Sequence, residues 1–155
     1  MLSVIHFPGY PGNKGGQSGF TLLEVLVAIV VLSIGLLGLA GLMATSMRNN
    51  HSAYQRTQAT WLAYDVIDRM RVNRPAAIAS SNNYDVALGA ASGSAGLAGV
   101  DITGWKATLA NALPAGDGSV DVDSVTREVT VVIQWNDSRG TGGTNAQQLR
   151  VDTQL

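Results

Sequence analysis

The side chains most often used in catalysis and metal binding are scarce in this chain of 155 residues. It has no cysteine, which excludes disulfides, thiolate metal sites and cysteine nucleophiles. Its two histidines, His6 and His51, show neither a zinc-ligand spacing nor a Ser–His arrangement. The net charge of -1 gives no bulk electrostatic reason to bind nucleic acid. We therefore predict a protein that is not an enzyme and carries no cofactor.

Four aspartates in the C-terminal part suggest calcium, because carboxylate oxygens are ligands that this ion prefers. They are Asp117, Asp121, Asp123 and Asp137. Asp121 and Asp123 alternate with valines, which places them on the exposed face of a strand. The spacing of the four is also not that of an EF-hand loop. We therefore predict no metal site.

One carboxylate, Glu24, stands inside a long apolar stretch. It is the only charged residue from Phe20 to Met47. About 20 apolar residues span a bilayer as a helix, and Val25–Ala44 alone supplies them. An acidic side chain near the bilayer centre costs about 2.5–3.5 kcal/mol. Glu24 therefore either reaches the interface or waits for a cationic partner.

Two other interpretations of the apolar stretch remain open. A buried core helix that is apolar on every face needs a much larger protein around it. A secretory signal peptide, cleaved near Ala44-Thr45-Ser46, has a shorter apolar region and a basic segment before it. Only Lys14 precedes this stretch. A transmembrane helix fits the pattern best.

The string GFTLLE at residues 19–24 opens this stretch and resembles the class III prepilin signal. The resemblance implies that a prepilin peptidase cleaves between Gly19 and Phe20 and then N-methylates Phe20. Residues 1–19 are then a leader peptide. Leaders of this family usually carry a basic residue beside the glycine, whereas Gln17 and Ser18 stand here.

Cleavage would expose a cationic amine at Phe20. A neighbouring subunit could offer its Glu24 to that amine at membrane depth, where opposite charges interact more strongly than in water. Such a pair would set the axial register between subunits. We therefore identify Glu24 as an assembly carboxylate.

No helix breaker lies between Gly41 and Pro75, which predicts one helix from about Phe20 to Asn73, ended by Pro75. Residues 20–47 are its expected transmembrane half, and residues 48–74 its amphipathic periplasmic half. The periplasmic half has an apolar stripe formed by Ala59, Leu62, Ala63, Val66, Ile67 and Met70.

Three glycines, Gly35, Gly38 and Gly41, recur inside the expected transmembrane half. Each costs a helix roughly 1 kcal/mol relative to alanine. They either permit close helix packing in lipid or form a flexible point. The resemblance to pilins favours the second role, because such helices partly melt in this stretch on assembly.

Residues 59–74, ATWLAYDVIDRMRVNR, resemble a stretch of the PilV type of minor pilin. The resemblance implies an inner-membrane precursor with a periplasmic C-terminal domain, later incorporated at the tip of a type IV pilus. Implied partners are the other minor pilins, the major pilin, the inner-membrane assembly platform and a tip adhesin. Cell adhesion and twitching motility are the implied processes.

Residues 75–155 form the expected C-terminal domain. Residues 87–100 are uncharged and mostly alanine, glycine and serine, which predicts a flexible loop. A short helix is expected over Ile102–Leu113. Three strands follow, with alternating apolar residues at 120–125, 129–135 and 149–155, and a turn at 136–143. We predict an α+β fold of the ladle type seen in pilins, in which the second half of the long helix packs on a small antiparallel sheet.

We expect a minor pilin that helps prime pilus assembly. A type II secretion pseudopilin would share the N-terminal signal, and a membrane-anchored periplasmic ligand-binding module would not need Glu24. Residues 48–74 carry a net charge of +3 and residues 75–155 one of -4, which favours contacts between unlike surfaces. The last strand either has a free edge for a partner or lies inside the sheet.

Overall fold

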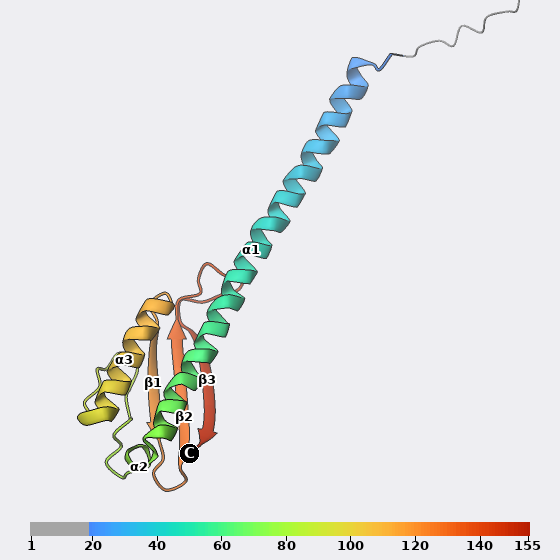
Figure 1. The fold of residues 1–155 in the computed structure, drawn as a ribbon. Coiled ribbons are helices and arrows are strands. Elements are labelled where there is room, and N and C mark those ends of the chain that lie inside the picture. Colours follow the sequence, from blue (N-terminus) through green and yellow to red (C-terminus); the bar gives the residue numbers. More distant parts are fainter. Residues whose placement is uncertain (1–18) are drawn as a thin grey trace, which may run out of the picture. The chain divides into compact units, whose positions relative to one another are not determined.

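The computed structural model describes residues 19–155 (Figure 1). The predicted leader, apart from Gly19, lies outside the described residues. The chain divides into two units, Met1–Ala40 and Gly41–Leu155. The boundary that we predicted between residues 47 and 48 stays a prediction.

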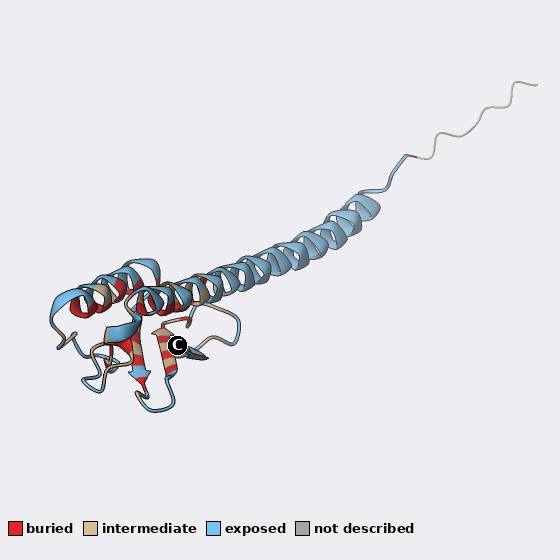
Figure 2. Ribbon diagram, turned by 60° about the horizontal axis from the view of Figure 1, so that its bottom comes forward, coloured by how far each residue is buried: buried red, intermediate tan, exposed pale blue. Residues whose placement is uncertain are grey.

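Helix α1 runs without interruption from Leu22 to Val72, close to the predicted bounds. Every residue from Gly19 to His51 is exposed, as the pale blue part of the helix in Figure 2 shows. Among residues 19–155, α1 is the one helix long and apolar enough to cross a membrane. An apolar helix surface with no protein cover is what a membrane span requires.

The second half of α1 packs on the rest of its unit through the predicted stripe. Its side chains Val66, Ile67 and Met70 are fully buried, and Leu62 lies at the margin of the core. Burying one such side chain contributes about 1.5–3 kcal/mol.

The sheet has the order β1-β2-β3 and is antiparallel throughout. Strand β1 covers Asp117–Val122, β2 covers Glu128–Trp135 and β3 covers Gln147–Gln154. Alternate residues of β1 and β2 are buried, so the sheet has an apolar face and a polar face. The predicted α+β fold is therefore confirmed.

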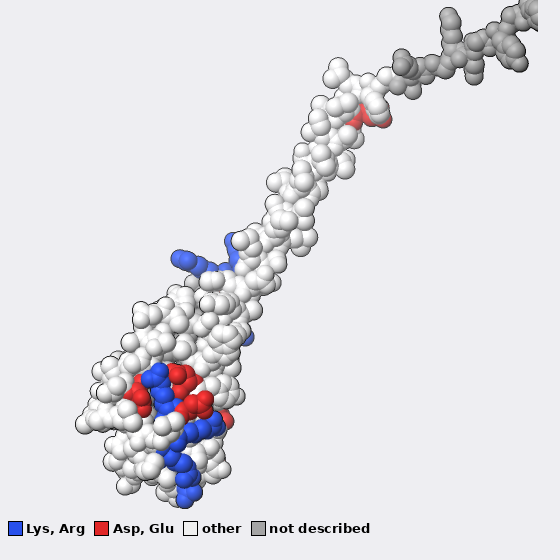
Figure 3. All heavy atoms as spheres, in the orientation of Figure 1, with Lys and Arg blue, Asp and Glu red and all other residues white. Residues whose placement is uncertain are grey.

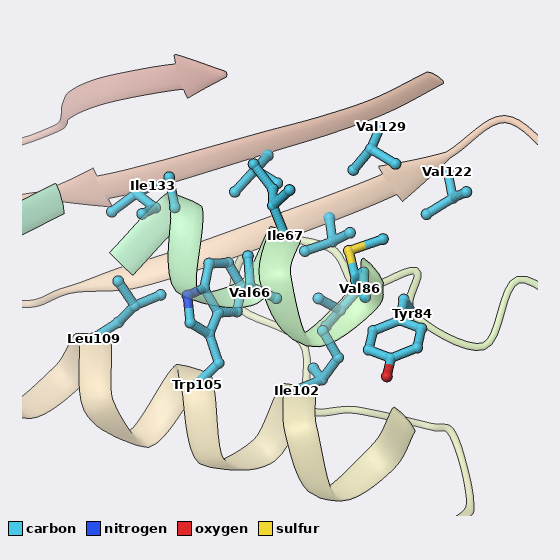
Figure 4. Close-up of a cluster of buried hydrophobic side chains, with 14 of the residues drawn as sticks. Val66, Ile67, Tyr84, Val86, Ile102, Trp105, Leu109, Val122, Val129 and Ile133 are labelled. Atoms are coloured by element: carbon cyan, nitrogen blue, oxygen red, sulfur yellow. The ribbon is translucent and has the colours of Figure 1, made fainter. Parts of the chain in front are cut away.

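Helix α3, Gly96–Ala112, lies beside α1 on the apolar face of the sheet (Figures 1 and 2). Figure 4 shows Trp105 and Leu109 of α3 directed toward the same core as Val66 and Ile133. The Trp105 indole N–H donates a hydrogen bond of 2.8 Å to the carbonyl of Leu62 in α1. Gly118 of β1 leaves room for that indole, because an added Cβ would lie 2.4 Å from the ring.

Two predicted boundaries are wrong, the start of the short helix and the end of the first strand. The segment 87–100 is not all loop, because α3 begins at Gly96. Gly99 permits this early start, since a Cβ there would lie too close to the carbonyl oxygen of Ser94. The long helix ends at Val72, close to the predicted Asn73, and Pro75 lies in a separate short helix, α2, Arg74–Ala77. Proline is tolerated in a first turn because its missing N–H has no helical partner there.

Val125 lies outside the strands and is 88% exposed. Asp123 also follows β1 rather than belonging to it. Its carboxylate accepts the N–H groups of Val125 and Thr126, so the two residues form a turn between β1 and β2. The hydrogen bonds from Thr126 and Val125 hold the pKa of Asp123 below its usual value.

The two outer strands of the sheet differ. The edge of β1 is covered, because Val86 exchanges two backbone hydrogen bonds of 2.9 Å with Val120. Strand β3 pairs only with β2 among the described residues. The alternative that the last strand lies inside the sheet is therefore wrong.

Candidate functional site

The predicted cleavage site lies directly before α1. Gly19 and Phe20 precede the first helical residue, Leu22, and Phe20 is 82% exposed. Neither residue contributes to the buried core. An exposed junction before a helix is a segment that a peptidase can reach without unfolding the C-terminal unit.

Thr21 starts the helix. Its hydroxyl accepts a hydrogen bond of 3.2 Å from the backbone N–H of Glu24. This satisfies one of the four N–H groups that have no partner in the first turn of a helix. Thr-x-x-Glu is the spacing of a capping box, so Thr21 and Glu24 also mark the start of the helix in the sequence.

Glu24 lies in the first turn of α1, where the helix dipole favours a negative charge. Its side chain shares a shallow groove with Phe20 and Ala28, so the structure places Phe20 and Glu24 on one face of the helix. In Figure 3 the red patch near that end of α1 stands on an otherwise uncharged surface. The arrangement can place a carboxylate and a new amine about one helical turn apart.

Gly35, Gly38 and Gly41 are exposed and helical. No atom would lie within 4 Å of a Cβ added at any of them. Their absent side chains therefore do not accommodate a neighbour within the described chain. Their role in helix flexibility stays a prediction.

The four aspartates of the calcium hypothesis do not converge. Asp117 forms an ion pair of 2.9 Å with Lys106, Asp121 is exposed, and Asp123 stabilises a turn. Burial alone would raise the pKa of Asp117, but the N–H of Gly89 and the ammonium of Lys106 together lower it. Among residues 19–155, no group of three or more His, Asp or Glu side chains could hold a metal ion.

Asp137 is the exception among these aspartates, because it is only 1% exposed. One carboxylate oxygen accepts a hydrogen bond of 2.5 Å from the hydroxyl of Ser52 in α1. The other lies near Gly140, where an added Cβ would be 2.7 Å away. The sequence predicts a turn at residues 136–143, and no periodic pattern there marks Asp137 as buried.

A polar network links the end of α1 to α3. The hydroxyl of Tyr84 donates a hydrogen bond of 2.7 Å to Asp101 and accepts one of 3.0 Å from Asn73. Arg69 pairs with Asp65 at 3.0 Å and lies 3.8 Å from Asp101. Asp68 pairs with Arg71 at 2.9 Å, so both aspartates of this part of α1 bond an arginine on the same helix.

Comparison with known families gives one match. The prokaryotic N-terminal methylation motif matches residues 14–40, a segment that includes Gly19, Phe20 and Glu24. This match indicates a type IV pilin-like or pseudopilin protein, a class of generally structural proteins. No curated protein and no solved structure matches the chain. The match ends before the C-terminal sheet, so it does not distinguish the PilV type from other pilin-like proteins.

Proposed function

We propose that this protein is a minor pilin of the PilV type, which helps prime type IV pilus assembly and is incorporated at or near the pilus tip. The observation that carries the proposal is the methylation motif at the start of an exposed apolar helix. Such a helix suits both a membrane precursor and a subunit held in a filament by helix packing.

The proposed route begins in the inner membrane, with the C-terminal domain in the periplasm. The prepilin peptidase cleaves after Gly19 and methylates Phe20. The Phe20 amine of one subunit then pairs with Glu24 of another. Phe20, just before α1, and Glu24 line the same groove, which supports this role because both groups can face the same neighbouring helix.

The proposed partners are the other minor pilins, the major pilin, the inner-membrane assembly platform and the tip adhesin. This part of the proposal rests on the resemblance of residues 59–74 to the PilV type. Exposed aromatic side chains in that segment, Trp61 and Tyr64, provide contact area on the side of α1 away from the core. Roles in cell adhesion and twitching motility follow from the same proposal.

A type II secretion pseudopilin is the second candidate, because the methylation motif indicates either class. Deletion of the gene separates the two candidates. Loss of surface pili with normal protein secretion supports the minor pilin, and the reverse result supports the pseudopilin. A membrane-anchored ligand-binding module would affect neither process and would keep residues 1–19.

Intact-mass measurement of the membrane-extracted protein tests the proposed processing. We expect a chain that begins at Phe20 and carries one additional methyl group. A Gly19→Leu variant is the matched control and should keep its full precursor mass, because the cleavage site is lost. A native chain that begins at Met1, or after Ser46, would contradict the proposal.

A further inference from the structure

Three buried polar side-chain atoms have no hydrogen-bond partner among residues 19–155. They are Gln55 Oε1 in α1, Trp135 Nε1 at the end of β2 and Asp137 Oδ1 just after it. Buried polar atoms are nearly always paired. Two of the three, Gln55 Oε1 and Asp137 Oδ1, belong to side chains that line one cavity, which indicates a missing polar ligand there.

A cavity of about 150 Å³ lies at this place. Its lining includes both Gln55 and Asp137, which are 4% and 1% exposed. The exposed side chains of His51 and Arg139 also line it. Because a water molecule occupies about 30 Å³, the cavity has room for a group of a few non-hydrogen atoms.

The chemistry of the cavity selects a hydrogen-bond donor with one positive charge. The two unpartnered atoms that line it are both acceptors, and one belongs to a carboxylate. The other polar atom of each of these two side chains already has a partner. Ser52 donates to Asp137 Oδ2 at 2.5 Å, and Gln55 Nε2 lies 2.9 Å from His51 Nε2. A primary ammonium supplies three N–H donors and balances one carboxylate. A divalent metal ion would have only one carboxylate ligand among the residues that line this cavity, so it fits the site less well.

The position of the cavity along the chain indicates where that ammonium comes from. His51 follows Met47, the last residue of the apolar stretch, by one helical turn, or about 6 Å. The headgroup layer of a bilayer begins at the hydrocarbon boundary and is about 5–8 Å thick on each side. Arg139, which lines the cavity and is exposed, supplies a cation for a phosphate.

We propose that this cavity binds the headgroup of an aminophospholipid such as phosphatidylethanolamine. Its ammonium donates to Asp137 Oδ1 and Gln55 Oε1, while its phosphate faces Arg139. The proposal rests on the membrane anchoring in the proposed function but not on pilus assembly. It predicts selection against phosphatidylcholine, whose quaternary ammonium has no N–H to donate.

The test uses the full chain in nanodiscs that contain equal amounts of phosphatidylethanolamine and phosphatidylcholine. Native mass spectrometry then measures the lipids that remain bound. We expect about tenfold more phosphatidylethanolamine than phosphatidylcholine, the range for a hydrogen bond to a charged group. Asp137→Asn should bring the two lipids close to equal retention, because the charge is lost while Ser52 can still donate to the amide oxygen.

Asp121→Asn is the matched control, since it removes an exposed aspartate from the sheet without touching the cavity. It should keep the native selectivity. Near-ultraviolet circular dichroism checks that each variant is folded. If Asp137→Asn does not fold, Gln55→Leu takes its place, because it removes the second acceptor and leaves an apolar side chain in a buried position.

Equal retention of the two lipids by the native chain would overturn the proposal, as would unchanged selectivity in the folded cavity variants. Two further arms identify other ligands. Loss of selectivity on addition of EDTA would show a metal ion instead, and full competition by soluble phosphoethanolamine at equal concentration would show a site for the free compound. Flotation with vesicles of either lipid measures anchoring separately, so a failure of the headgroup site is distinguishable from a failure of the proposed membrane location.

Discussion

At the scale of single residues, Glu24 combines two roles that can be separated. It belongs to the first turn of α1, where its N–H bonds to Thr21 and its charge suits the helix dipole. It is also the only charged side chain among residues 20–47. The first buried residue of α1 is Gln55, far along the helix from Glu24, so neither role involves the sheet.

Glu24→Gln and Glu24→Ala should both prevent stable incorporation into filaments. Glutamine also fits a capping box, so the glutamine variant keeps the helix start and removes only the charge that the Phe20 amine needs. Blotting of sheared surface pili beside the membrane fraction measures incorporation. The thermal unfolding of the C-terminal unit should not change in either variant.

Glu128→Gln is the control for this experiment, because Glu128 is the only other glutamate and is exposed on β2. It should incorporate normally. If Glu24→Gln incorporates as well as the native chain while Glu24→Ala does not, the helix start rather than the charge matters. Normal incorporation of both variants would exclude an assembly role for Glu24.

The sequence alone indicates the importance of Glu24 but not that of Gln55 and Asp137. Glu24 was identified because a charge in an apolar stretch is conspicuous in a linear pattern. Gln55 and Asp137 were not, because their burial depends on a turn meeting α1 across 85 positions of sequence, where Ser52 bonds Asp137. Neither position is apolar, so no periodicity indicates that it faces inward.

At the scale of elements, local patterns predicted the type of each major helix and strand, and tertiary contacts decided several boundaries. The alternation in 129–135 predicted β2, and the stripe at 59–70 predicted the buried face of α1. The start of α3 was missed because three of the four residues in its first turn, Gly96, Ala98 and Gly99, are small and also suit a loop. Glycine is needed at position 99 because the Ser94 carbonyl approaches too closely for a Cβ, and not because the segment is flexible.

Tyr84 links the end of α1 to α3 and makes the fold sensitive to alkaline pH. Burial and the hydrogen bond to Asp101 raise its pKa to about 12, from an ordinary value of 10.0. The folded chain therefore keeps this proton to higher pH than the unfolded chain does. The stabilisation is complete below pH 10 and is lost as pH rises from about 10 to 12.

Tyr84→Phe should lower the free energy of unfolding at pH 7 by about 1–2 kcal/mol, because two hydrogen bonds are lost. It should also reduce the loss of stability between about pH 10 and 12. Urea unfolding followed by circular dichroism at several pH values measures both effects. Tyr64→Phe, at a half-exposed position on α1, is the control and should change neither. An unchanged alkaline slope in Tyr84→Phe would show that another group titrates.

At the scale of the whole molecule, the C-terminal unit contains the core, and residues 19–40 of the first unit are exposed. Within residues 19–155, Val86 pairs with the edge of β1, whereas β3 pairs with β2 alone and leaves its outer edge open. The N–H of Leu155 donates to the carbonyl of Arg127, the residue before β2, so it points toward that strand. In an antiparallel pair the N–H groups of successive residues alternate in direction. Gln148 lies seven residues before Leu155, so its N–H points away from β2. A partner strand can use these groups without disturbing the core.

We expect the fragment 48–155 to fold and to bind the soluble domains of companion minor pilins. It retains every residue of the buried core, from Gln55 onward, and its circular dichroism should show helix and strand.

If pairing occurs through β3, Gln148→Pro should fold but lose binding, since proline is tolerated at an edge position whose N–H faces solvent. Gln148→Ala keeps that N–H and should bind like the native fragment. A folded native fragment that binds no companion at tens of micromolar would leave the membrane half of α1 as the assembly determinant, whereas equal binding by both Gln148 variants would place the contact on another surface.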